Sequence, residues 1–170
     1  TLLASSAASD VYKRQFLELA DYFGHEGTDE REMMNLLYVT VKALLNKNIS
    51  NRLVRCIYEL RTMAVQGLMP ELLNCAACGR EFAEKEELFF SQEVHGIIGK
   101  ECLGKVSDTR RLSPAARYAM IYIVSAPMGK LYTFTVTEEV LGELEYHIHR
   151  YVYQNTDKKF KSLDILEMMC

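Results

Sequence analysis

The chain has 170 residues, of which 49% are hydrophobic and 25% are charged, the composition of a soluble globular protein. Its 20 lysines and arginines and 23 aspartates and glutamates leave a net charge of -3, which excludes a chain-wide attraction to polyanions and leaves only local basic patches for nucleic acid. No apolar run reaches the roughly 18 residues of a membrane span, and five cysteines without a signal peptide do not suggest a secreted disulfide scaffold. We therefore expect a cytoplasmic protein with no membrane partner.

The first 15 residues differ in character from the rest of the chain. Residues 2–9 are small, apolar or hydroxylated, and the basic Lys13 and Arg14 follow them, which reverses the order found in a signal peptide. We expect residues 1–15 to be a poorly ordered flank, either foreign to the gene or a frayed native end.

Residues 16–72 have the pattern of a helical domain, the first part of a bundle. Apolar side chains recur at three- and four-residue spacing over 33–45 and again over 53–64. Ser50 is placed to cap the second of these helices. Two apolar-faced helices joined by a few residues are expected to pack as an antiparallel pair.

Residues 73–104 predict a cysteine module, with an antiparallel ribbon formed by two short β-like segments. The thiols of Cys75 and Cys78 are separated by two residues and followed by a glycine, a spacing that lets both reach one tetrahedral zinc ion. Cys102 supplies a third ligand. A second Cys-x-x-Cys pair would place the fourth ligand at position 99, where the chain has Gly99, so His95 is the candidate substitute.

Two other interpretations of these cysteines stay open. A degenerate knuckle keeps its fold without metal. A dithiol oxidoreductase also carries Cys-x-x-Cys, but the βαβ pattern that surrounds it in such enzymes is missing here.

Residues 105–170 predict the second part of the helical domain. Ser113 before Pro114 is a strong helix-start signal, and Thr137 precedes the last long helix. His147 and His149 of that helix point in different directions, so we expect them to be solvated or packed on tyrosine rather than metal-bound. The predicted fold class is mainly α, a helical bundle interrupted by a small zinc-ribbon or zinc-knuckle-like β module.

Basic residues concentrate locally, in the stretches 47–61, 105–130 and 158–161. Such patches can contact phosphates without reading sequence, although an ordinary solvated surface has the same pattern. Arg52 and Arg55 lie opposite the apolar face of their predicted helix, and Arg110 and Arg111 precede the helix that starts at Ser113. These four arginines are our candidates for contact with nucleic acid or with an acidic peptide.

Five short motifs follow one another along the chain: Tyr58-Glu59-Leu60-Arg61, Gly67-Leu68-Met69-Pro70, Cys75-Ala-Ala-Cys78-Gly79, Phe90-Ser91 and Lys161-Ser162-Leu163. In this order they resemble the bacterial DNA repair and recombination mediator family RecO, over residues 16–166. Gly99 stands where the family has its third cysteine. The family begins with an amino-terminal β-barrel of the OB type that residues 1–15 cannot encode, so the chain resembles the C-terminal portion.

The resemblance implies a non-enzymatic mediator of DNA repair and homologous recombination. Such proteins bind single- and double-stranded DNA, anneal strands, and act with RecR and the acidic tail of the single-stranded-DNA-binding protein so that RecA can load. For the cysteine module the resemblance implies a zinc site that is degenerate in this chain, with Gly99 in place of a cysteine, and some members of the family lack the site. The alternative function is a free-standing zinc-knuckle module for protein interaction.

Overall fold

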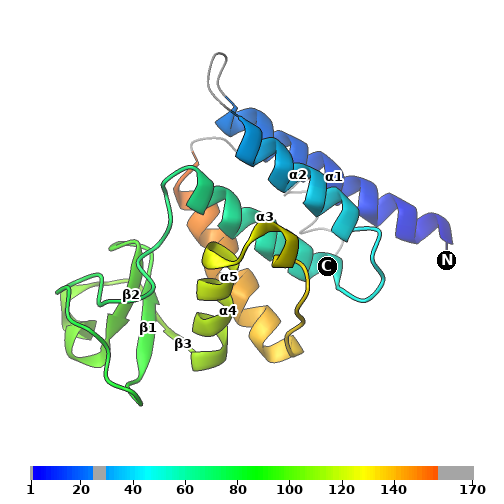
Figure 1. Cartoon of the computed structure of the whole chain (residues 1–170). Helices are drawn as coiled ribbons and strands as arrows, with labels where there is room; N and C mark the ends of the chain where they lie inside the picture. The colour runs from blue at the N-terminus through cyan, green and yellow to red at the C-terminus, as the bar shows by residue number, and fades with distance from the viewer. Residues whose placement is uncertain (1, 25–29, 157–170) are drawn as a thin grey trace.

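The structure, a computed structural model, describes residues 2–24 and 30–156. It is mainly helical with one small sheet, which confirms the predicted fold class (Figure 1). The elements are α1 (Leu2–Phe23), α2 (Arg31–Ala43), α3 (Asn51–Val65), β1 (Leu88–Ser91), β2 (Gly96–Gly99), the 3-10 helix η1 (Lys100–Lys105), β3 (Thr109–Leu112), α4 (Pro114–Ser125), the 3-10 helix η2 (Met128–Lys130) and α5 (Glu138–Gln154).

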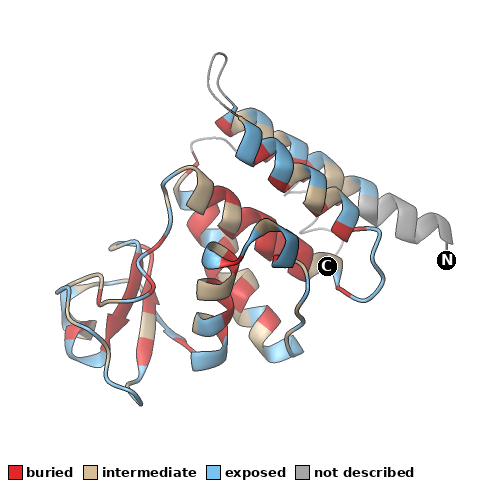
Figure 2. Ribbon diagram, in the orientation of Figure 1, coloured by how far each residue is buried: buried red, intermediate tan, exposed pale blue. Residues whose placement is uncertain are grey.

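Helix α3 is the centre of the helical domain. It contacts α1 and α2 on one side and α4 and α5 on the other, and Figure 2 shows it buried along nearly its whole length. Tyr58 illustrates the packing, because its ring lies 4.6 Å from the ring of Phe16 and its hydroxyl donates to the Phe16 carbonyl. The expectation that Arg55 lies on a solvent-facing side is wrong, since α1 and α5 cover that side and leave Arg55 only 9% exposed.

The predicted helix starts are confirmed by their capping contacts. The side chains of Ser50, Ser113 and Thr137 each accept a hydrogen bond from the amide three residues later, at 3.2, 3.1 and 3.4 Å. Each cap satisfies an amide that has no partner inside its helix, and Pro114 at the first position of α4 has no amide to satisfy.

The β module is a three-stranded antiparallel sheet in the order β2-β1-β3. The predicted ribbon corresponds to β1 and β2, with Phe90 opposite Ile97. Sequence patterns missed β3, which pairs Arg110 with Phe90 on the other edge of β1 and extends the sheet beyond residue 104. The backbone of Glu71 also joins β2: a Cβ on Gly96 would lie 2.6 Å from the Glu71 carbonyl oxygen, so only glycine fits there.

The structure describes the beginning of the chain from Leu2 onward and does not describe residues 157–170 at its end. Residues 1–15 are expected to be a poorly ordered flank, whereas α1 begins at Leu2, and Tyr12 and Gln15 are buried. The Lys161-Ser162-Leu163 motif lies outside the described residues. Within the described part of the chain, none of the helices has the length and apolarity needed to cross a membrane.

Candidate functional site

Three of the predicted metal ligands meet at one end of the β module. The carbonyl of Cys75 accepts hydrogen bonds from the amides of Cys78 and Gly79, and Gly79 takes a φ of 76°, so the chain turns tightly after the second thiol. Cys102 arrives from η1. The three Sγ atoms lie within 4.8 Å of one another, and sulfurs around a tetrahedral zinc are about 3.8 Å apart because each Zn–S bond is about 2.3 Å. The three thiols therefore fit three ligand positions of a zinc ion.

Hydrogen bonds give the thiols different proton affinities. Burial alone would raise the pKa of Cys75, but the backbone amides of Gly99 and Ala77 and the thiol of Cys78 donate to its sulfur and lower this pKa to about 7. The thiol of Cys102 donates to Cys78 and Cys75, and this contact together with burial raises its pKa to about 11. The pKa of Cys75 is thus the lower of the two, and a metal ion that binds the cluster displaces thiol protons.

The space that a cysteine side chain at position 99 would take is occupied by an ion pair. A Cβ built on Gly99 would lie 2.2 Å from Oε1 of Glu86 and 2.4 Å from Nη2 of Arg80, so the space of a cysteine side chain is filled by these two partners. Nη1 of Arg80 donates to Oε2 of Glu86 at 2.8 Å, and hydrogen bonding to Arg80 lowers the pKa of Glu86.

His95, the predicted fourth ligand, is not part of the cysteine cluster. It is exposed at the turn between β1 and β2 with a φ of 53°, and its ring lies 5.9 Å from that of Tyr151 in an edge-to-face contact. Tyr151 belongs to α5, on the side of the ribbon that packs against the helices. His95 therefore points to the helical domain rather than to the thiols.

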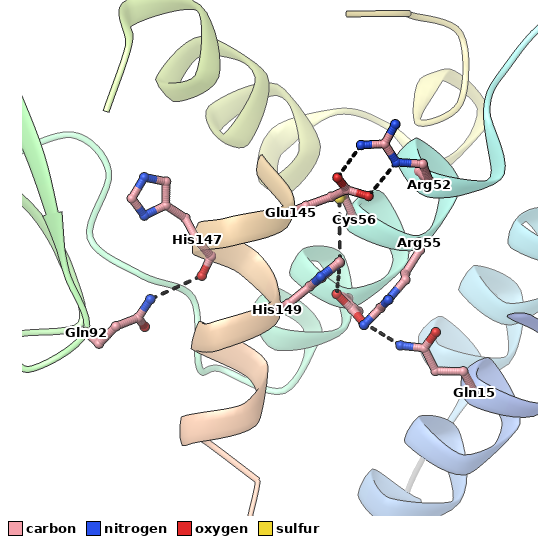
Figure 3. Close-up of polar contacts among 9 residues, drawn as sticks. Gln15, Arg52, Arg55, Cys56, Gln92, Glu145, His147 and His149 are labelled. Carbon is pink, nitrogen blue, oxygen red and sulfur yellow. Dashed lines mark hydrogen bonds and ion pairs between the residues drawn. The ribbon is translucent and has the colours of Figure 1, made fainter. Parts of the chain in front are cut away.

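The structure places two of the four candidate arginines in ion pairs between or within helices. Arg52 on α3 donates from Nε and Nη2 to the two carboxylate oxygens of Glu145 on α5, at 2.8 and 2.6 Å (Figure 3). Its Nη1 donates to Glu138. Arg55 donates from Nε to Glu59 at 2.9 Å inside the core. The Arg52 guanidinium joins α3 to α5, whereas Arg55 pairs within α3, so both groups already have carboxylate partners.

The other two arginines lie side by side on β3 but differ in their partners. Nη2 of Arg111 pairs with Glu87 at 3.2 Å. The Arg110 guanidinium instead stacks on Tyr146 of α5, with Cζ 3.7 Å from the ring centroid, and Arg150 lies 5.3 Å from the same ring. Sequence reasoning missed Tyr146 and Arg150; their four-residue spacing on a helix was the available signal, but it does not reveal that β3 packs beside them.

A polar cluster inside the helical domain includes a buried cysteine. Sγ of Cys56 lies 3.9 Å from Nε2 of His149, which pairs with Glu59 at 3.2 Å. A cysteine that contacts a histidine, which in turn contacts a carboxylate, resembles a nucleophilic triad. Burial, however, raises the pKa of Cys56 well above its ordinary value. Because the thiolate is the nucleophile, this thiol is inert.

An apolar groove runs along α4. It has a volume of about 720 Å³ and is lined by Tyr118 and Tyr122 of α4 and by Phe134 and Val136 of the segment before α5. The hydroxyl of Tyr122 donates to the backbone carbonyl of Lys130, which holds the Tyr122 ring in place in the groove wall. None of the four candidate arginines lines it.

Comparison with known proteins identifies the family. A family model described as "Recombination protein O C terminal" matches residues 14–164. The chain is 28% identical over 113 residues to "DNA repair protein RecO" of Acetivibrio thermocellus, an alignment that covers 66% of this chain and 44% of that protein. It is 26% identical over 152 residues to "DNA repair protein RecO" of Desulforamulus reducens, covering 89% of this chain and 58% of the relative.

A further relative, from Alkaliphilus metalliredigens and also called "DNA repair protein RecO", is 24% identical over 155 residues, which cover 91% of this chain and 62% of that protein. The chain thus matches between 44% and 62% of the length of these three relatives. The family model covers both parts of the helical domain and the cysteine module between them. The chain therefore belongs to the RecO family and corresponds to its C-terminal region.

Proposed function

We propose that this chain is the helical, C-terminal part of a cytoplasmic, non-enzymatic mediator of DNA repair and homologous recombination. In this role it binds single- and double-stranded DNA, contacts RecR, and engages the acidic tail of the single-stranded-DNA-binding protein. The observation that carries the proposal is the family match over residues 14–164, together with relatives that are named DNA repair proteins. A free-standing zinc-knuckle module is not favoured, because the match includes the helices on both sides of the knuckle.

The apolar groove along α4 is the proposed binding site of the acidic tail. An amphipathic or extended peptide with an apolar end needs a dry groove for that end and cations for its carboxylates. Tyr118, Tyr122 and Phe134 supply apolar walls for the apolar end of such a peptide. Tyr118 is 73% exposed, so its ring is available to a partner.

A peptide titration tests this part of the proposal. The probe is a fluorescent peptide with the sequence of the tail, measured by anisotropy against the full chain at low salt. We expect binding that Tyr118→Ala weakens and that Tyr153→Ala, a change at another exposed tyrosine outside the groove, leaves unaltered. No binding of the tail peptide at low salt would remove the groove from the proposal.

We also propose that Cys75, Cys78 and Cys102 bind one zinc ion. Their sulfurs are close enough for three ligand positions, and Cys75 loses its proton near neutral pH. Metal analysis of the reduced protein should find about one zinc per chain, and Cys75→Ser should abolish it. Cys56→Ala is the matched control, because Cys56 lies outside the cluster and should not change the zinc content. Protein that contains no zinc when purified with zinc present would contradict the assignment.

A further inference from the structure

A small polar pocket opens where β3 packs beside α5. It has a volume of about 150 Å³, and its walls include Thr109 and Arg110 from the β module and Tyr146 and Arg150 from α5. Gln92 also lines it and donates to the backbone carbonyl of His147, which ties the end of β1 to α5 (Figure 3). Because both elements are held together by this contact, the pocket is a fixed feature of the junction.

Two arginines reach this pocket without a carboxylate partner. Neither Arg110 nor Arg150 takes part in an ion pair among the described residues, whereas Arg52, Arg55 and Arg111 all do. Both guanidinium groups lie over the Tyr146 ring. Stacking uses the face of a guanidinium and leaves its N–H edge available, so each arginine can still donate hydrogen bonds.

One acidic residue lines the same pocket, but its charge is already held in place. The carboxylate of Asp108 accepts hydrogen bonds from the Ser91 hydroxyl at 2.7 Å and from the backbone amides of Gln92 and Glu93 at 2.9 and 3.2 Å. Burial alone would raise the pKa of Asp108, but these hydrogen bonds lower it. Asp108 therefore stays ionised as an internal cap of the turn after β1, and the two arginines still outnumber it.

The histidine of the pocket, His147, is neutral at pH 7. Its pKa is lowered to about 4, chiefly by burial and also by the charges of Arg110 and Arg150, against the raising effects of a hydrogen bond to the Arg111 backbone and of Glu143. At pH 7 the pocket therefore carries the positive charges of Arg110 and Arg150 and the negative charge of Asp108, whose oxygens already accept hydrogen bonds from the protein. Two like charges beside one ring repel each other, and an anion between them relieves that repulsion.

We infer that this pocket binds a phosphate group of a single-stranded nucleic acid through Arg110 and Arg150. The inference rests on the proposed function for the source of the phosphate. A tetrahedral phosphate offers acceptor oxygens to both planar guanidinium forks at once. An acidic peptide is the less suitable ligand because its apolar end needs a groove such as that along α4, where neither arginine lies. Contacts of this kind fix a strand in place without reading its bases.

Anisotropy of a fluorescein-labelled oligo-dT of about 20 nucleotides, titrated with the full chain at several KCl concentrations, tests the inference. For single strands the slope of log K against log salt is about -0.7 per neutralised phosphate. We expect Arg110→Ala and Arg150→Ala each to weaken binding several-fold and to reduce the slope by about 0.7. Arg111→Ala, next to Arg110 but paired with Glu87, is the matched control and should keep the slope of the unaltered chain.

The outcomes separate this site from the wider proposal. Unaltered chain that does not bind oligo-dT at low salt, or Arg110→Ala, Arg150→Ala and Arg111→Ala slopes that are all equal, overturns the inference. Loss of tail-peptide binding in Arg110→Ala and Arg150→Ala, with oligo-dT binding retained, overturns it in favour of a carboxylate site. Slopes reduced only at Arg110 and Arg150, in a chain that neither binds the tail peptide nor anneals complementary strands, support the site and count against the mediator role.

Discussion

Oε2 of Glu59 lies 3.2 Å from Nε2 of His149, and this contact joins the central helix α3 to α5. The other carboxylate oxygen of Glu59 accepts from Nε of Arg55, on the same helix. Glu59 is 1% exposed and Arg55 is 9% exposed, so the carboxylate is the counter-charge that keeps a guanidinium inside the core. A buried pair of this kind contributes little by itself, but removal of one partner leaves the other charge without compensation.

Glu59→Leu should therefore destabilise the chain strongly. We expect a loss of about 3–5 kcal/mol in the free energy of unfolding, because Arg55 would remain buried and charged. Urea denaturation followed by circular dichroism measures it. Glu87→Ala removes an exposed pair with Lys100 and Arg111 and should cost no more than about 1 kcal/mol. Equal losses in the two variants would contradict the assigned role of Glu59.

His147 should make stability depend on pH. Its pKa is about 4 in the folded chain and about 6.5 when unfolded. The unfolded chain therefore takes up the proton first as the pH falls below about 6.5, and the contribution of neutral His147, complete above that pH, is lost progressively down to about pH 4.

The measurement is the free energy of unfolding at pH 7.5 and at pH 5.0. His147→Gln keeps a donor for the Arg111 backbone but cannot be protonated. From pH 7.5 to pH 5.0 the variant should therefore lose about 2 kcal/mol less of its free energy of unfolding than the unaltered chain loses. If His147→Gln keeps the full pH dependence, another group is responsible for it.

Zinc affinity should rise when the fourth ligand position is made available. Gly99→Cys alone adds a thiol into the space of the Arg80–Glu86 pair. Gly99→Cys combined with Glu86→Ala removes the carboxylate in that space and completes a four-thiol set. Chelator competition should show tighter zinc binding in the double variant than in Glu86→Ala alone. The same affinity in both would mean that position 99 does not face the thiol cluster.

Gly96→Ala should weaken the β module. The added methyl group would lie 2.6 Å from the Glu71 carbonyl oxygen, a backbone atom that cannot move aside without breaking its pairing with β2. We expect a cost of about 1–3 kcal/mol in thermal or urea unfolding. Gly129→Ala is the control, since nothing lies within 4 Å of its added Cβ and its φ suits an ordinary residue. A similar stability of the two variants would contradict the close approach of Glu71.

Local patterns were sufficient for the starts of α3, α4 and α5 and for the turn that carries Cys75 and Cys78. Ser50, Ser113 and Thr137 satisfy amides within a single turn, so sequence alone identifies them as helix starts. The turn at Cys75 and Cys78 is equally local. β3 could not be found in this way, because two of its four residues are arginines and its pairing depends on an edge of β1 that local sequence does not reveal.

The roles of the arginines depended on tertiary contacts. Arg52 pairs with Glu145 and Glu138, which are 93 and 86 residues away along the chain, so its charge pattern on the helix could not show that it was already neutralised. The stacking of Arg110 on Tyr146 could not be predicted for the same reason, because the two residues lie far apart in the sequence. Charge density located the basic stretches, but only the packing of α5 against α3 and β3 distinguishes a paired arginine from an available one.

The central place of α3 has a consequence for how the chain opens. Since α1, α2, α4 and α5 all rest on it, its backbone amides reach solvent only when the surrounding helices separate together. Amide hydrogen exchange should therefore be slowest in α3 and should there report the global free energy of unfolding, while the ends of the outer helices exchange through local fraying. A partner that docks on any outer helix thus acts on one cooperative unit.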